Sequence, residues 1–133
     1  MKYAYPAILT PEDDKIIVSV PDLAGLHTFG DDLPDAIFMA QDAVEMWLWC
    51  AENNQESIPI ASSIISIVKQ CENPESFVSM IVADTDEYRR QNDTRAVKKT
   101  LTIPAWLNHK AEQFNAPFSQ ILQEGLKQYL EAK

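Results

Sequence analysis

Residues 33–53, LPDAIFMAQDAVEMWLWCAEN, decide the fold of the first half of this 133-residue chain. Apolar residues recur there at the i, i+4, i+7 and i+8 spacing of one helical face. The stripe comprises Ala36, Ile37, Ala40, Val44, Trp47, Leu48 and Ala51. It is widened by Met39, Ala43, Met46 and Cys50. The pattern predicts a long helix that is apolar over much of its circumference and that packs against more than one neighbour.

Short β-rich runs lie on the amino-terminal side of this helix. Residues 3–9 and 16–20 are joined by TPEDD at 10–14, whose Pro and Asp residues suit a turn, so we expect a β-hairpin. Residues 27–29 are a candidate third strand. The sequence GDD at 30–32 follows and supplies cap residues for the helix.

The carboxyl-terminal side of the helix is less regular. Residues 54–76 show no sustained pattern apart from a candidate short helix over 62–70. FVSMIVA at 77–83 is rich in β-branched residues and predicts a strand that completes a small sheet. The elements together predict an α+β domain over residues 1–83.

The composition is typical of a soluble globular protein, with 46% hydrophobic residues, 23% charged residues, 3 Gly and 8 Pro. It excludes a disordered chain, a collagen-like repeat and a disulfide scaffold. No apolar run approaches the roughly 18 residues that span a bilayer, and the first residues lack the apolar region of a signal peptide. Cys50 and Cys71 form no CxxC pattern. We expect a cytoplasmic protein that binds no membrane.

The charge is unevenly distributed along the chain, whose formal net charge is −9 at pH 7. Residues 1–83 hold three Lys and thirteen acidic residues, whereas residues 84–133 hold eight basic and seven acidic residues. Five of the basic residues fall between Arg89 and Lys99, beside the single acid Asp93. The acidic first part argues for a basic partner, and the local positive field argues for a different one. The sequence predicts two surfaces for two partners.

The last third of the chain contains one predicted strand and two predicted helices. DTDEYRRQNDTRA at 84–96 is polar and predicts a linker, with a candidate helical turn at its start. VKKTLTIP at 97–104 predicts a strand, and helices are expected over 105–115 and 117–131. This tail is shorter than the roughly 40 residues that a domain without metal or disulfide needs to bury enough surface. It must therefore pack on something else.

A second copy of the same chain can supply that neighbour. Leu101 and Ile103 would face the helices, and Lys98, Thr100 and Thr102 would face outward. Two such strands can pair antiparallel over a shared four-helix core. This pattern resembles the ribbon–helix–helix fold of the MetJ and Arc repressors, which place the ribbon in the major groove of DNA.

The ribbon–helix–helix resemblance implies that Lys98, Thr100 and Thr102 read base edges. Lysine can donate to guanine O6 and N7, and threonine can offer its hydroxyl to a base or its methyl to thymine. The resemblance also implies that the second helix points the backbone amides near Phe118 and Ser119 at a phosphate. A plain dimerisation tail with a solvated Lys and Thr face is the alternative that the sequence leaves open, as is further pairing of dimers into a tetramer.

The chain as a whole resembles the HicB-type antitoxins. Residues 5–49 carry Tyr-Pro-Ala, Val-Pro-Asp-Leu-x-Gly, Thr-x-Gly-Asp and an Ala-rich helix in the family's order. FVSMIVADTDEY and KKTLTIPAWLNHKAEQFNAPFSQILQEGL resemble the strand, linker and carboxyl-terminal segment of the family's ribbon–helix–helix branch. The likeness fails only around residues 54–76. Pro117 departs from the polar capping residue that the family often has there.

The HicB resemblance implies a partial RNase H-like domain over residues 1–83 that binds a small HicA-type toxin, an RNA-cleaving protein with a double-stranded-RNA-binding-like fold and a catalytic His. Binding would block the toxin's RNA-cleaving surface. The tail over residues 97–133 would bind operator DNA as a homodimer and repress the toxin–antitoxin operon. The charge agrees, because an RNA-binding toxin is expected to be basic. No catalytic residue, cofactor or metal site is expected.

Two other functions stay open at this point. One is a small RNase H-like, metal-dependent nuclease or hydrolase, and the other is a ligand-sensing transcriptional regulator without a toxin. The carboxylates that could serve a metal sit mostly in adjacent pairs typical of turns. They are Asp13, Asp14, Asp22, Asp31 and Asp32. His27 and His109 stand in no metal-binding or catalytic pattern.

The polar side of the helix over residues 33–53 carries two aromatic residues. Phe38, Asp42, Glu45 and Trp49 form this ridge, and exposed aromatics would make an apolar patch. We expect the ridge to be covered by the toxin, by a second antitoxin chain, or by residues 54–76 folding back. Its two carboxylates favour the toxin over a second copy, because a copy would oppose like charges.

Overall fold

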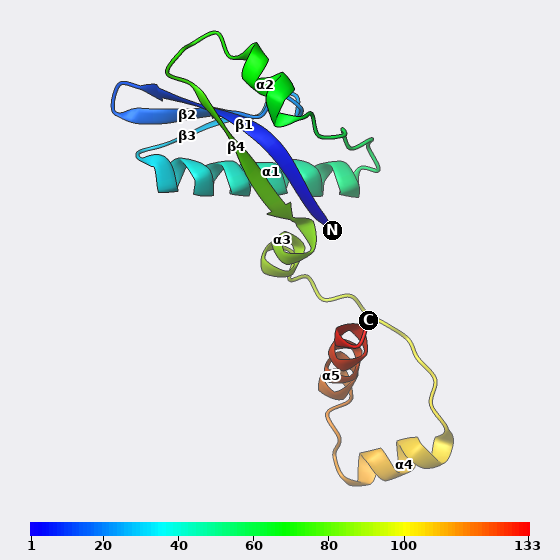
Figure 1. The fold of residues 1–133 in the computed structure, drawn as a ribbon. Helices are drawn as coiled ribbons and strands as arrows, with labels where there is room; N and C mark the ends of the chain where they lie inside the picture. Colours follow the sequence, from blue (N-terminus) through cyan, green and yellow to red (C-terminus); the bar gives the residue numbers. More distant parts are fainter. The chain divides into compact units, whose positions relative to one another are not determined.

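The structure is a computed structural model that describes all residues from 1 to 133. The chain divides into two units, Met1–Arg95 and Ala96–Lys133, and each is described by itself. The first unit is a β-sheet with the long helix α1 across one face and the short helix α2 on the other (Figure 1). Its mixed α and β character agrees with the sequence-based expectation.

The sheet has four antiparallel strands in the order β3-β2-β1-β4. The strands are β1 (Lys2–Glu12), β2 (Lys15–Ser19), β3 (His27–Gly30) and β4 (Phe77–Asp84). β1 and β2 form the predicted hairpin, and its turn holds Asp13 at a φ of 53°, in the left-handed region that Asp tolerates. β4 pairs with the other side of β1. The four predicted strands are confirmed.

Helix α1 (Leu33–Asn53) forms over the predicted residues. The side chain of Asp32 caps it by accepting a hydrogen bond of 2.9 Å from the backbone N–H of Asp35. The buried face consists of Ala36, Ala40, Val44, Leu48 and Ala51. Small residues let the helix approach the sheet closely, since a Cβ on Gly30 would lie 2.2 Å from the backbone nitrogen of Ala36. The sheet contributes Tyr5, Ala7, Leu9, Val18, Val20, Ile81 and Ala83 to the same core.

Helix α2 (Ile64–Gln70) lies on the opposite face of the sheet, where Ile67 and Pro6 of β1 are fully buried. The segment before α2 is fixed by Asp22, whose carboxylate accepts hydrogen bonds from the backbone N–H and the hydroxyl of Ser62 at 2.9 and 2.6 Å. The candidate helix over 62–70 is therefore confirmed with a slightly later start.

Helix α3 (Thr85–Asn92) follows β4 directly, where the sequence predicts a linker over 84–96. The side chain of Asp84 caps it by accepting from the backbone N–H groups of Asp86 and Glu87 at 3.0 and 3.2 Å. Only Thr85 and Tyr88 of this helix are buried. The candidate helical turn at the start of this segment is present, but it extends over eight residues. Two buried residues give too weak an apolar pattern to predict a helix of that length.

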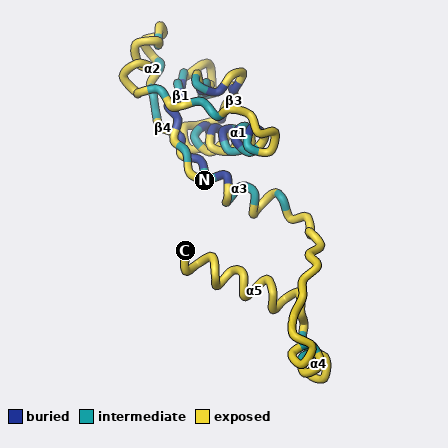
Figure 2. Tube along the Cα trace, turned by 90° about the vertical axis from the view of Figure 1, so that its right-hand side faces the viewer, coloured by how far each residue is buried: buried dark blue, intermediate teal, exposed yellow.

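The second unit consists of α4 (Ala105–Gln113) and α5 (Phe118–Glu131) after an extended segment. The strand predicted over 97–104 is not formed, because a strand needs a neighbour and the single chain offers it none. No residue from 96 to 133 is buried (Figure 2). In neither unit is any helix long and apolar enough to cross a membrane.

Candidate functional site

The predicted DNA-reading residues lie in the extended segment of the second unit. Lys98, Thr100 and Thr102 are all exposed, and so are Leu101 and Ile103 between and after them. Successive side chains of an extended segment alternate between two faces, so the segment separates a polar face from an apolar one. The structure leaves both faces free.

The second predicted DNA contact is the start of α5. This helix begins at Phe118, so the backbone N–H groups of Phe118 and Ser119 have no acceptor within the helix. Pro117 provides no side-chain cap, as its departure from the family pattern suggests. The amides remain available to an external anion.

The helices of the second unit expose a large apolar surface. Its main members are Trp106, Leu107, Phe114, Phe118, Ile121, Leu122, Leu126, Tyr129 and Leu130, each more than a third exposed. Soluble monomers seldom expose a contiguous apolar surface of such size. The second unit therefore presents the apolar face of an incomplete fold.

The predicted ridge on α1 is only partly free. Phe38 is 66% exposed and Asp42 is exposed. Glu45 accepts a hydrogen bond of 3.4 Å from the backbone N–H of Asp84. Trp49 packs against Tyr88 of α3, with 5.6 Å between ring centroids. The cover over Trp49 comes from α3, which is none of the three sources that the sequence suggested.

A polar cluster around Glu52 fastens α3 to the end of α1. Its carboxylate accepts hydrogen bonds from the Tyr3 and Thr85 hydroxyls, each at 2.9 Å, and pairs with Arg89 at 3.3 Å. Burial, together with the hydrogen bond to Glu52, raises the pKa of Tyr3 to about 12. Burial and the negative charges of Asp42 and Glu45 also raise the pKa of Tyr88. Sequence reasoning missed this cluster because its members are far apart in the chain.

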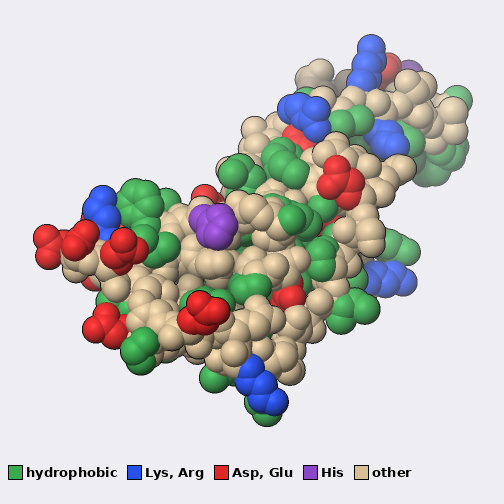
Figure 3. All heavy atoms as spheres, turned by 90° about the horizontal axis from the view of Figure 1, so that it is seen from above, with side chains coloured by type: hydrophobic (Ala, Val, Ile, Leu, Met, Phe, Trp, Pro, Cys, Tyr) green, Lys and Arg blue, Asp and Glu red, His purple; other side chains and the backbone are tan.

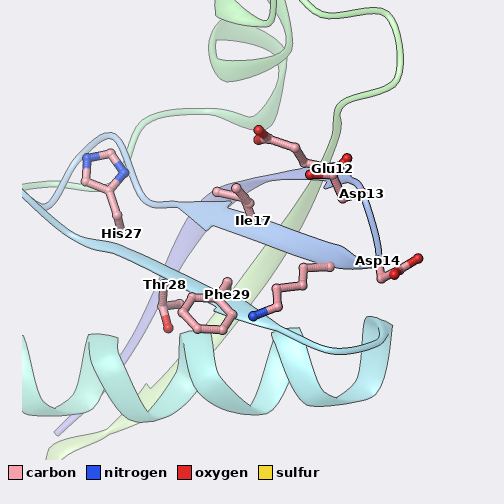
Figure 4. Close-up of a pocket in the computed structure, with 8 residues that line it drawn as sticks. Glu12, Asp13, Asp14, Ile17, His27, Thr28 and Phe29 are labelled. Atoms are coloured by element: carbon pink, nitrogen blue, oxygen red, sulfur yellow. The ribbon is translucent and has the colours of Figure 1, made fainter.

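An open cavity of about 480 Å³ lies on the face of the sheet that points away from α1. Its apolar floor includes Ile17 of β2 and Phe29 of β3, which are directly paired across the two strands. The carboxylates of the β1–β2 hairpin lie at one end of the cavity and His27 lies at the other (Figure 4). The sequence analysis assigned no function to this surface.

The carboxylates considered for a metal have separate structural positions. Asp22 holds Ser62, Asp32 caps α1, and Asp13 and Asp14 form the hairpin turn. The chain contains no group of three or more His, Cys, Asp or Glu side chains arranged to hold a metal ion.

The chain thus consists of an acidic α/β unit followed by a helical unit in which no residue is buried. The family described as the HicB-like antitoxin of bacterial toxin-antitoxin systems matches residues 5–128, and the chain belongs to this family. The chain is also 29% identical over 112 residues to an uncharacterized 14.9 kDa protein from the rep-hol intergenic region of Haemophilus phage HP1, covering 84% of this chain and 81% of that protein.

Two solved structures share the fold. A toxin–antitoxin complex from Streptococcus pneumoniae aligns with a TM-score of 0.60 and 24% identity, over 97% of this chain and 99% of the other. The Burkholderia pseudomallei antitoxin HicB aligns with a TM-score of 0.56 and 20% identity, over 98% of both chains. At these identities the likeness establishes the fold alone.

Proposed function

We propose that this protein neutralises a HicA-type, mRNA-cleaving toxin and represses its own operon by binding DNA. The observation that carries the proposal is the family match, which spans both units of the chain. The similar pneumococcal structure is itself a toxin–antitoxin complex. In this proposal the chain acts by binding and catalyses no reaction.

Neutralisation is assigned to the first unit, as a partial RNase H-like domain that covers the RNA-cleaving surface of the toxin. Residues 1–95 hold 17 Asp and Glu against six Lys and Arg. A protein that cleaves RNA is expected to be basic, so the two fields are complementary. Such complementarity speeds association more than it adds affinity.

The exposed end of the α1 ridge, Phe38 with Asp42, is one candidate contact for another chain. Glu45 keeps its negative charge while it accepts a hydrogen bond from the backbone N–H of Asp84, and Trp49 lies under α3. The ridge therefore retains both carboxylate charges, which favour the toxin over a second antitoxin chain at the Phe38 end.

Operator binding is assigned to the second unit, as a ribbon–helix–helix dimer. Two copies of the segment over 97–104 would pair into the ribbon, and the exposed apolar face of α4 and α5 would become the shared core. Lys98, Thr100 and Thr102 would then face the DNA bases. The free amides at the start of α5 would meet a phosphate. Pairing of two such dimers into a tetramer is compatible with this arrangement.

The test uses the full chain and a DNA fragment carrying the promoter of its own operon. In electrophoretic shift assays, Thr100→Ala with Thr102→Ala should alter sequence preference by about 1–3 kcal/mol for each base that is no longer read. Thr94→Ala, an exposed threonine outside the proposed ribbon, is the matched control. Unchanged preference in the double variant would remove the ribbon as the reading element.

Neutralisation is tested by growth. The toxin is sought as a short basic open reading frame next to this gene, and co-expression with it should restore growth that the toxin alone arrests. Failure of the wild-type chain both to restore growth and to bind that protein would contradict the antitoxin assignment.

A further inference from the structure

The face of the sheet opposite α1 is only partly covered, since Met80 and Val82 of β4 are 37% and 59% exposed even on the side where α2 lies. α2 contacts β4 and β1, and it buries Ile67 where Pro6 is buried as well. Nothing comparable lies over β2 and β3, where Ile17 is 37% and Phe29 is 51% exposed. Both side chains point away from α1, because Val18, the neighbour of Ile17, is buried in the α1 core.

This bare part of the sheet carries a charged border. Acidic side chains gather at one end of the face, beside hydrophobic side chains and a histidine (Figure 3). The hairpin residues Glu12, Asp13 and Asp14 border the cavity that Phe29 also lines. The ammonium group of Lys15 lies 4.5 Å from the centre of the Phe29 ring.

The contact between Lys15 and Phe29 shows that a cation can reach the face of this ring. Aromatic rings attract cations within about 6 Å of their centroids, and Arg makes such contacts more often than Lys. A partner's arginine placed there would also lie beside the hairpin carboxylates. The cavity thus combines an apolar floor, a ring that accepts a cation and a negative border.

We propose that the bare part of the sheet, formed by Ile17, Phe29 and the Glu12–Asp14 hairpin, is the surface on which the basic toxin docks, with a toxin Arg or Lys replacing Lys15 over the Phe29 ring. This inference rests on the proposed antitoxin function and specifies its surface. A second antitoxin chain is disfavoured as the occupant, because it would bring a second set of hairpin carboxylates against the first. Nucleic acid is disfavoured by the same carboxylates.

The first experiment measures binding of the full chain to the product of the short basic open reading frame sought next to this gene, by titration calorimetry. Phe29→Ala should weaken binding by about 30-fold, as expected for a central aromatic contact. The comparison is Phe38→Ala, which truncates the aromatic of the other candidate contact; Phe38 is 66% exposed and Phe29 is 51% exposed. A loss below tenfold for Phe29→Ala overturns the proposal, whatever Phe38→Ala does.

The second experiment changes charge alone, which guards against a folding defect in Phe29→Ala. Glu12→Gln, Asp13→Asn and Asp14→Asn together should slow association by about tenfold at low salt. Asn tolerates the positive φ of Asp13, so the turn is preserved. The control combines Glu56→Gln, Glu72→Gln and Glu124→Gln, three exposed carboxylates outside the hairpin and the α1 ridge. Equal effects of the two triple variants would refute the docking surface.

A substitution of Lys15 should change toxin binding in the opposite direction to the variants above. Lys15→Met removes the cation that occupies the Phe29 ring, so it should tighten toxin binding by about three- to tenfold, from the strength of one cation–π contact. Lys69→Met makes the same change in net charge on α2 and should alter binding less. Weaker binding or no change in Lys15→Met would contradict the replacement of Lys15 by a toxin cation.

The outcomes for the surface and for the function are separable. If the wild-type chain binds the neighbouring protein and the Phe29 and hairpin variants bind equally well, the surface is wrong and the antitoxin assignment stands. If the wild-type chain does not bind it, the antitoxin assignment fails and this surface fails with it.

Discussion

Truncating Trp49 should unfold the first unit more easily, whereas truncating Phe38 should not. The two aromatics share the α1 ridge, but Trp49 is half-buried against Tyr88 and Phe38 is 66% exposed. Removing a fully buried aromatic costs about 3–5 kcal/mol, and an aromatic pair adds about 0.5–1.5 kcal/mol. Because Trp49 is only half-buried, the cost of truncating it is smaller than for a fully buried aromatic. We therefore expect Trp49→Ala to destabilise the first unit by about 2–3 kcal/mol. Phe38→Ala should stay within about 0.5 kcal/mol.

Thermal melting of the full chain, followed by far-ultraviolet circular dichroism at fixed concentration, measures the difference. For a unit of this size, Tm falls by about 4–8 °C for each kcal/mol, so Trp49→Ala should lower Tm by about 10–20 °C. Trp49→Phe is the control: it keeps a ring against Tyr88 and removes an indole N–H that is buried without an acceptor. Its Tm should stay close to the wild-type value.

Equal melting temperatures for Trp49→Ala and the wild type would refute the assignment of α3 as the cover. If Trp49→Ala melts like the wild type and also loses toxin binding, Trp49 would be assigned to a partner interface instead. The double truncation of Phe38 and Trp49 cannot separate these cases, because it mixes a packed aromatic with an exposed one.

Three further outcomes follow from the structure. Gly30→Ala should lower the stability of the first unit by about 3 kcal/mol, because the added Cβ would lie 2.2 Å from the backbone of α1. A Cβ added at Gly125 in α5 has no neighbouring atom within 4 Å, so Gly125→Ala should be neutral or slightly stabilising. The free energy of unfolding should fall as pH rises from about 10 to 12, because the Tyr3 hydroxyl has a pKa of about 12 in the folded chain and stabilises the fold only while it is protonated beside Glu52. Tyr3→Phe should flatten this part of the pH profile in alkaline melting curves. A fragment of residues 1–95 should melt cooperatively and bind toxin but not shift operator DNA, and loss of toxin binding in the folded fragment would contradict the division of labour.

Helix α1 and the sheet of the first unit could be predicted because their buried residues recur at regular spacings in the sequence. The apolar stripe from Ala36 to Ala51 is helical, and the strands alternate or run apolar between turn residues. Only a helical turn at the start of α3 could be predicted, and not its full length. Tyr88 alone makes an extensive apolar contact, and its partner Trp49 lies 39 positions earlier. The segment over 97–104 forms no strand for a different reason, because no other strand of the chain pairs with it.

The candidate docking surface lay beyond sequence reasoning for a related cause. Ile17 and Phe29 belong to strands whose residues look like ordinary core positions. Their exposure depends on where α2 stops across the sheet, and α2 comes from the region with the weakest sequence pattern. The contact between Lys15 and Phe29 likewise requires the register that pairs β2 with β3. The exposure of these residues and their contacts are set by tertiary packing, which the local periodicity of the sequence does not reveal.

No residue of Ala96–Lys133 is buried in the single chain. If the core of this second unit forms only between two chains, its folding free energy includes the free energy of association and falls by about 1.4 kcal/mol with each tenfold dilution. Operator occupancy would then decline with the square of the free chain concentration, while toxin capture by the first unit would decline only in proportion to it. A cell that dilutes or degrades this protein would derepress the operon before it lost neutralisation.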